Sequence, residues 1–414
     1  MIVFRLRMRM IAVYRLVPSA CLRARIVGMV GLEVTSYSCH LYVTSATRKL
    51  PEMPTNPAGT TGSREPTKTG LSDDFSREKI DRRISVAPMV DWTDRHCRFF
   101  LRGCAPNVLL YTEMITSAAI LRGDRTRLLA FHPEEHPLAL QLGGSDPAEL
   151  AAAARAGEEA GYDEINLNCG CPSERVASGA FGACLMQEPE RVAECVAAMR
   201  AAVRLPVTVK MRIGVVSATA RQVAGAVGQF DEHDFESLCR FTAAVRAAGC
   251  AVVIVHARKA VLGALSPREN REIPPLRYDV VRRLKGAFPT LPVIVNGGLR
   301  DARSVIAALG CYDGVMLGRE AYHRPFVLAE LQRALWGGTL PTRLALIERM
   351  QRYAAGELAR GGRLAPIVRH MLGLYAGEPG AREYRRTLSE GARSEGAGVE
   401  LLRRAMPGPA RPEA

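Results

Sequence analysis

The sequence lacks several features that would place it in common functional classes. No apolar run among its 414 residues is long and uncharged enough to cross a bilayer, so we expect no membrane partner. Its 11 cysteines are scattered and form no framework of the kind that staples small secreted domains, which favours a reducing compartment and a cytoplasmic protein. A glycine-rich dinucleotide-binding turn is also missing, because "DWTDRHCRFF" follows the first predicted strand.

Acidic residues are absent from the first 32 positions, where arginine is frequent, and Glu33 is the first of them. This composition is typical of an organelle transit peptide, and a stretch translated upstream of the true start would look the same. Residues 51–70 have the composition of a disordered linker. We therefore expect a basic leader and linker over residues 1–80, with a mitochondrial or plastid location if the leader is a genuine targeting signal.

The charge balance favours an acidic partner. The formal net charge is +14 at pH 7, and nucleic acid is the commonest partner of such a chain. An arginine-rich proteome would produce the same excess without any such partner. Charge alone therefore permits binding of RNA or DNA and does not establish it.

Eight short β-branched segments alternate with helical stretches after Arg83, as expected for strands buried on both faces. Eight strand–helix units predict a TIM (β/α)8 barrel over residues 81–325, with an open doubly wound sheet as the alternative. Amphipathic helices without strands follow, and predict a small helical domain over 326–404 and a disordered tail over 405–414. The predicted strands are "ISVAPMV", "VLLYTEM", "PLALQLGG", "EINLNCG", "VTVKMRIG", "VVIVHAR", "PVIVNGG" and "GVMLGRE".

Candidate functional residues, most of them polar or glycine, stand at the carboxyl end of each predicted strand, where barrel enzymes carry their active sites. This common position is the strongest functional signal in the chain. The residues are Met89, Asp91, Glu113, Gln141, Asn168, Cys171, Lys210, Arg212, His256, Arg258, Asn296, Gly297, Gly298, Gly318 and Arg319.

The last two strands end in glycines that suit a phosphate group. Gly297 and Gly298 allow backbone N–H groups to approach an anion, and Gly318 precedes Arg319 at the start of a predicted helix. Phosphate sites of TIM barrels usually form after strands seven and eight. The sequence therefore predicts a phosphate-bearing cofactor here.

Lys210 lies on an otherwise apolar strand, where an ammonium group is costly unless it meets an anion. Three interpretations remain open: a Schiff-base lysine, a positive charge beside a flavin, or a structural pair with a carboxylate such as Glu113. Gln141 either bonds the flavin edge or is a satisfied core amide. His256 and Arg258 fit an anionic ligand, although a lone histidine is more often structural.

Cys169 and Cys171 are separated by one residue, so they cannot form an unstrained disulfide. A closed zinc site needs four ligands, and no second pair stands nearby at metal spacing, so we expect no metal. Proton chemistry remains, and Cys171, held between Gly170 and Pro172, is the candidate general acid. Cys169 is assigned to packing.

These motifs together resemble the tRNA-dihydrouridine synthases, close to the bacterial A-type subfamily that acts at position 20/20a of the tRNA D-loop. The similarity covers residues 85–390 and is carried by "SVAPMVDWTDRHCRFFLR", "EINLNCGCPSERV", "VKMRIG" and "VHARKA" with the later glycine motifs. The segment after Gly214, residues 215–234, is longer than in the family and is predicted to be a surface insertion.

The resemblance implies an FMN enzyme, recharged by NADPH, that acts on tRNA, and we expect a monomer. It implies Cys171 as the proton donor. By resemblance the FMN contacts are Pro88, Met89, Val90, Gln141, Lys210, His256, Asn296, Gly297, Gly298, Gly318 and Arg319. By resemblance the tRNA contacts are Asn168, Arg268, Arg271, Arg382 and Arg385.

The residues are chemically consistent with this expectation. Reduced flavin can deliver hydride to C6 of uracil, and C5 then needs a proton from the opposite face, which a cysteine can supply. The base must first leave its stack. Two other functions remain open: an FMN barrel acting on a free pyrimidine, and an RNA-binding module that has lost catalysis and flavin.

Overall fold

The computed structural model describes residues 80–173, 181–219 and 221–408. Residues 1–79 of the predicted leader, which spans residues 1–80, therefore lie outside the described residues. Residues 409–414 of the predicted tail also lie outside them. The described residues belong to one compact unit. Within them, no helix is both long and apolar enough to cross a membrane.

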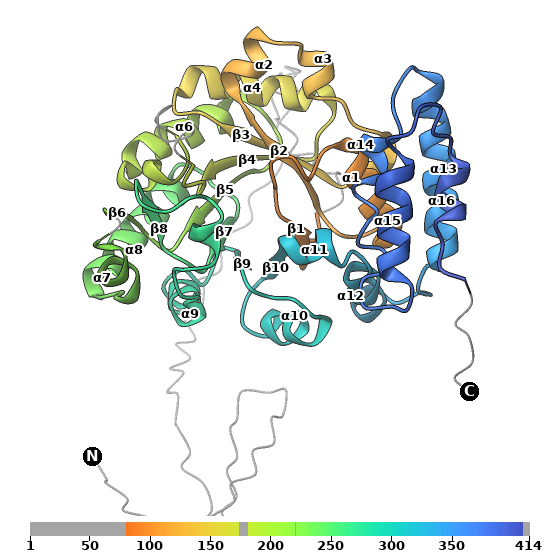
Figure 1. The fold of residues 1–414 in the computed structure, drawn as a ribbon. Coiled ribbons are helices and arrows are strands. Elements are labelled where there is room, and N and C mark those ends of the chain that lie inside the picture. Colours follow the sequence, from red (N-terminus) through yellow and green to blue (C-terminus); the bar gives the residue numbers. More distant parts are fainter. Residues whose placement is uncertain (1–79, 174–180, 220, 409–414) are drawn as a thin grey trace, which may run out of the picture. The chain divides into compact units, whose positions relative to one another are not determined.

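An eight-stranded parallel sheet forms the centre of this unit (Figure 1). Its order is β1-β10-β9-β7-β5-β4-β3-β2, and a bridge from Ser85 to Leu109 joins the two outermost strands. The ring is therefore closed, so the predicted TIM barrel is confirmed and the open doubly wound sheet is wrong. The strands are β1 (Ile84–Val86), β2 (Leu110–Thr116), β3 (Leu138–Gly143), β4 (Glu164–Cys169), β5 (Val207–Arg212), β7 (Val253–His256), β9 (Val293–Asn296) and β10 (Gly314–Leu317).

Helices surround the ring of strands on the outside (Figure 1). The predicted ends of one of them are confirmed: Asp146 accepts from the N–H of Glu149, Pro147 is the first helical residue, and Gly161 ends the helix with φ 100°. The barrel helices are α1 (Arg95–Cys104), α2 (Ser117–Arg122), α3 (Arg125–Leu128), α4 (Pro147–Ala160), α6 (Pro189–Ala202), α7 (Val223–Gly228), α8 (Glu232–Ala247), α9 (Tyr278–Ala287), α10 (Ala302–Leu309) and α11 (Arg319–His323).

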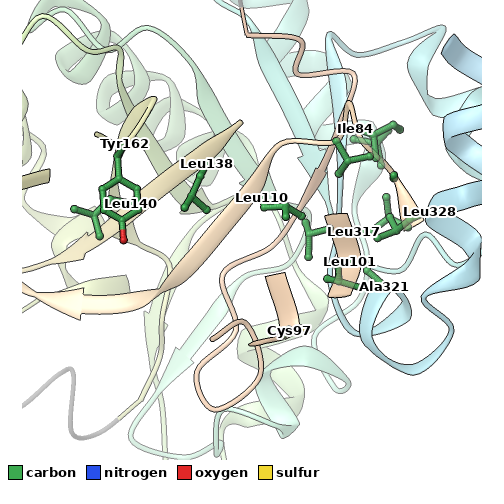
Figure 2. Close-up of a cluster of buried hydrophobic side chains, with 14 of the residues drawn as sticks. Ile84, Cys97, Leu101, Leu110, Leu138, Leu140, Tyr162, Leu317, Ala321 and Leu328 are labelled. Atoms are coloured by element: carbon green, nitrogen blue, oxygen red, sulfur yellow. The ribbon is translucent and has the colours of Figure 1, made fainter. Parts of the chain in front are cut away.

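Two hydrophobic clusters stabilise the barrel. The larger fills the space between strands and helices, and Figure 2 draws part of it, with Ile84 of β1 and Leu317 of β10 near Leu328 of α12 (Phe326–Trp336). The smaller contains Tyr111, Ile254 and other residues of β2, β3, β7, β9 and β10. Because side chains alternate along a strand, one set of positions packs outward and the other fills the ring.

Helices follow the barrel, as predicted, and the structure packs them beside α1 (Figure 1). Arg95 in the first turn of α1 forms an ion pair with Glu357, and Asp94, which caps α1, contacts Arg369 and His370. The boundaries 81–325, 326–404 and 405–414 stay a prediction. These helices are α12 (Phe326–Trp336), α13 (Arg343–Ala359), α14 (Ala365–Val368), α15 (Ala381–Gly391) and α16 (Glu400–Arg404).

Two short strands outside the ring involve the predicted insertion. β6 (Val215–Ser217), at the start of residues 215–234, pairs in parallel with β8 (Ala260–Leu262). Helix α7 follows within the same segment. β1 is equally short, but it lies in the longer run "ISVAPMV", whereas β6 ends at Ser217 and β8 is followed by Gly263, so the sequence did not predict these two strands. The pair connects the segment after β5 with the segment after β7.

Candidate active site

The strand register brings the polar residues of the rim together at one end of the barrel. Asn168 on β4 lies beside Lys210 on β5. Arg212, two residues later, lies beside His256 on β7, which lies beside Asn296 on β9. Residues that are distant in the sequence therefore share the carboxyl rim of four neighbouring strands.

Lys210 is a half-buried ammonium group without a compensating carboxylate. Burial, and after it the Arg212 guanidinium, lower the pKa of Lys210 to about 7. No carboxylate of the described residues contributes to that shift. Glu113, suggested as a structural partner, instead accepts a hydrogen bond from the backbone N–H of Asp91. The structure therefore does not support the Lys210–Glu113 pair.

His256 and Arg212 lie on the rim next to this position. Burial and then Arg212 and Lys210 hold the pKa of His256 well below its usual value, so its imidazole is neutral. Arg212 is buried, and burial lowers its pKa to about 9. Its guanidinium donates to the backbone carbonyls of Gly170 at 3.1 Å, Asn270 at 3.0 Å and Lys259 at 3.4 Å. Arg212 thus joins the loop after β4 to two points of the segment after β7, a role that sequence analysis missed although "KMR" places two cations on one strand face.

The backbone conformation at positions 297 and 298 requires glycine. Their φ angles are 110° and 75°, in the left-handed region that favours glycine. A Cβ at Gly297 would lie 2.5 Å from Cδ2 of His256, and one at Gly298 would lie 2.3 Å from Leu276. Asn296, just before them, donates from Nδ2 to the carbonyl of Met316 at 2.7 Å. The turn after β9 therefore brings bare backbone to the rim.

The turn after β10 is more open. A Cβ at Gly318 would meet no atom within 4 Å. Arg319 begins α11, as predicted, and its guanidinium pairs with Glu272 at 2.7 Å. Bare backbone at two neighbouring turns, with buried cations beside them, fits a group that carries a phosphate.

The loop between β1 and α1 forms another part of the rim. Met89 donates from its backbone N–H to Thr93 Oγ1 at 2.9 Å, and its carbonyl accepts from the N–H of Thr93. Asp91 has φ 65°, which is strained for a non-glycine residue. Pro88 and Val90 flank Met89, and Val90 is 58% exposed. The loop leaves an apolar side chain open at the rim.

Cys171 lies on the loop after β4. The backbone N–H groups of Gly170 and Cys171 donate to Asn168 Oδ1 at 3.1 and 3.0 Å, and the carbonyl of Cys171 accepts from Ala183 at 2.9 Å. Cys171 is half-buried, and Cys169 is wholly buried. Residues 174–180 of this loop are outside the described residues. In the described ranges, no three metal-ligating side chains come together.

The four arginines predicted to contact tRNA lie in two places. Arg268 and Arg271 are exposed on the basic loop, which we define as residues 257–277. The carbonyl of buried Asn270, between them, is held by Arg212 at the rim. Arg382 and Arg385 are exposed on α15. The structure therefore links the first pair to the barrel mouth, whereas the second pair belongs to a helix that carries none of the other site residues.

Gln141 belongs to a buried polar network below the rim. Its Nε2 donates to Asn166 Oδ1 at 2.7 Å, and its Oε1 accepts from Asn168 Nδ2 at 2.8 Å. Sequence analysis missed Asn166 and Glu164, which are wholly buried. The sequence does indicate this polar network, because Glu164, Asn166 and Asn168 alternate in "EINLNC" and must share one face of β4.

Comparison with known proteins gives a consistent result. The family model described as "Dihydrouridine synthase (Dus)" matches residues 85–407. A tRNA-dihydrouridine(20/20a) synthase of Xanthomonas axonopodis pv. citri is 55% identical over 324 residues, covering 78% of this chain and 93% of the relative. Proteins of the same name from Shewanella oneidensis and Pseudomonas aeruginosa are 52% and 51% identical, covering 79% and 75% of this chain and 93% and 90% of the relatives.

Proposed function

The chain belongs to the dihydrouridine synthase family, and from that premise we propose that it reduces uridine to 5,6-dihydrouridine in the tRNA D-loop, at position 20/20a. FMN is the proposed cofactor and NADPH the proposed reductant. We propose a monomer that works in the cytoplasm, or in an organelle if the leader is a targeting signal.

The observation that carries this proposal is the cationic barrel mouth. Lys210, Arg212 and His256 share the rim with one half-buried thiol, Cys171. The pKa values of Lys210 and Arg212 are lowered by burial, and no carboxylate of the described residues counters either shift. Buried cations without counterions are costly, and an anionic ligand removes that cost.

The rim residues fit FMN at both of its ends. The turns at Gly297–Gly298 and Gly318 offer backbone to the phosphate, with Arg319 beside them. Lys210 and Gln141 would hold the polar edge of the ring system, with neutral His256 between the two ends. Asn296 and the loop of Pro88, Met89 and Val90 would complete the site. When bound, reduced FMN supplies a hydride to C6 of uracil.

The chain's own residues supply the proton and the positioning. Cys171 would donate its thiol proton to C5, and it needs no nucleophilic role. Asn168 holds the backbone of this loop through two hydrogen bonds, so it fixes where the thiol lies. Its remaining amide hydrogen would meet the edge of the target base, which must be flipped out of its stack to reach the rim.

The tRNA backbone would contact the arginines. Arg268 and Arg271 on the basic loop stand next to the mouth, where phosphates near the target base would lie. Arg382 and Arg385 on α15 would contact a more distant part of the tRNA.

The direct test uses the purified full chain with FMN and NADPH, and tRNA transcripts that lack modifications. We expect dihydrouridine at position 20 or 20a by mass spectrometry, and a yellow protein with flavin absorbance. Reduction of free uridine at the same rate as tRNA would instead favour a small-molecule enzyme. A colourless protein that binds tRNA without changing it would favour an RNA-binding module.

A further inference from the structure

A chain of hydrogen bonds runs through the interior of the barrel and ends at the Cys171 loop. Its members are Glu164, Asn166 and Asn168 on β4, Thr208 on β5 and Gln141 on β3. Glu164, Asn166 and Thr208 are wholly buried, and Gln141 and Asn168 are 1% and 8% exposed. Every link is between 2.7 and 2.8 Å. The interior therefore holds one continuous polar path on one side of the ring.

The lower end of this chain is an acceptor. Arg82 donates to Glu164 Oε2 from two nitrogens, at 2.6 and 2.9 Å. Oε1 of Glu164 accepts from Tyr111 at 2.6 Å and from Thr208 at 2.7 Å. A carboxylate paired with arginine can only accept hydrogen bonds. The single hydroxyl hydrogen of Thr208 therefore points to Glu164, because its other acceptor, the carbonyl of Ile165, is more distant at 3.4 Å.

This end determines the direction of each later link. Since the hydrogen of Thr208 is used, its oxygen can only accept, and Asn166 donates to it from Nδ2 at 2.8 Å. Oδ1 of Asn166 then faces Gln141 and accepts from its Nε2. Oε1 of Gln141 in turn accepts from Asn168 Nδ2. Oδ1 of Asn168 is left facing the backbone N–H groups of Gly170 and Cys171.

We propose that Glu164, Thr208 and Asn166 are positioning residues that fix the amide orientation of Gln141 and Asn168. By this relay Asn168 presents an N–H, and not a carbonyl, to the target base. The inference rests on the proposed function, which makes Asn168 a contact of the base. Reversal of the relay would turn Asn168 Nδ2 toward two N–H donors of the loop, an arrangement without any hydrogen bond.

The orientation of Asn168 has a consequence for substrate choice. Of the two hydrogens on Nδ2, one is used by Gln141, and no acceptor within the described ranges takes the other. An N–H donor pairs with O4 of uracil and opposes the N4 amine of cytosine. The relay would therefore make the site select uridine over cytidine, through residues that never touch the base.

Thr208→Val tests the relay most cleanly. Valine shares the β-branched shape of threonine and suits a strand, but it lacks the hydroxyl, so it removes the acceptor that orients Asn166. Thr242→Val on α8 is the matched control, because Thr242 is equally buried and donates only to the carbonyl of Leu238. Thr208→Ser retains the hydroxyl and should rescue the effect.

The measurement is the equilibrium affinity of the flavin-loaded full chain for two tRNA transcripts, with uridine or cytidine at the target position. We expect Thr208→Val to lower the preference for uridine by about tenfold, the usual effect of one lost hydrogen bond. Flavin content should match that of Thr242→Val, whereas the melting temperature of Thr208→Val should be lower, because Asn166 Nδ2 loses its buried acceptor. An unchanged preference in Thr208→Val, with an active parent, would overturn the relay alone, whereas an inactive parent would overturn the proposed function with it.

Glu164→Gln provides an independent second test. Arg82 would retain the amide oxygen of the new side chain, so its nitrogen would face Thr208 and donate to it. Donors would then stand at both ends of the relay, because the backbone N–H groups of Gly170 and Cys171 face Asn168 Oδ1, so at least one link of the relay is lost. We expect the preference for uridine to fall, and a preference equal to that of the parent would contradict the polarity argument.

Discussion

The ammonium group of Lys210 is held where it destabilises the fold by itself. Burial and Arg212 lower its pKa to about 7, and no carboxylate in the described part of the chain opposes this. A side chain that is costly in the folded protein is useful where it meets an anion, such as the polar edge of a reduced flavin. This cost should be measurable in the protein freed of flavin.

Replacing Lys210 by methionine removes the charge and retains the length of the side chain. Below about pH 7 the parent lysine is charged in both the folded and unfolded states, so the full penalty of burying the charge is present. Between about pH 7 and 10.5 the folded state releases the proton first, so the penalty fades as the pH rises. We expect Lys210→Met to raise the free energy of unfolding at pH 6, on the order of 2 kcal/mol.

The measurement is urea unfolding of flavin-free parent and variant at pH 6, 8 and 10. The advantage of Lys210→Met should shrink steadily over this range. An advantage that is the same at all three pH values would show that Lys210 is not held with a lowered pKa.

At the scale of elements, the basic loop joins the surface that we propose faces RNA to the barrel mouth. The side chain of Asn270 accepts from the N–H of Val261 at 2.7 Å and donates to the carbonyl of Leu265 at 2.9 Å. The backbone carbonyl of Asn270 accepts from the guanidinium of Arg212. Arg271, the next residue, is exposed. The loop is thus anchored at one buried residue and presents arginine directly beside it.

Arg271→Ala should weaken tRNA binding through the loss of one phosphate contact. The slope of log affinity against log salt concentration should fall by about one, because fewer counterions are released. Arg155→Ala is the control, since Arg155 is exposed on the outer helix α4. Salt titrations of parent and variants give the slopes, and equal slopes for Arg271→Ala and the parent would remove Arg271 from the interface.

The sequence predicted most elements but not the links between them. All eight strands and the caps of α4 were predicted, because strong periodicity and capping residues are local signals. β6 and β8 lie in no longer apolar run of the kind that surrounds the equally short β1, so they gave no such signal. The roles of Arg212 and of the Glu164–Thr208–Asn166 relay depend on which strands are neighbours and in what register. That information is absent from any one segment, although "EINLNC" already places three polar side chains on one face of its strand.

At the scale of the whole molecule, the residues that stabilise the barrel and the candidate site residues lie at opposite ends of the strands. Arg82, Glu164 and Tyr111 form a buried cluster at the start of β4, whereas Lys210, His256 and the Cys171 loop lie at the strands' carboxyl ends. Beside the ring, the C-terminal helices contact the start of α1, which directly follows the loop of Met89 and Val90. A tRNA bound across both parts, as we propose, would thus reach the mouth where the half-buried thiol of Cys171 follows the end of β4.

Protonation of C5 by that thiol is tested most directly by the dihydrouridine yield of Cys171→Ala on unmodified tRNA, beside Cys184→Ala as the matched control. Cys184 is also half-buried and follows the same loop. We expect Cys171→Ala to retain flavin and tRNA affinity and to lose at least about 100-fold in yield, while Cys184→Ala remains close to the parent. A Cys171→Ala variant that makes dihydrouridine as fast as the parent would show that the proton comes from elsewhere.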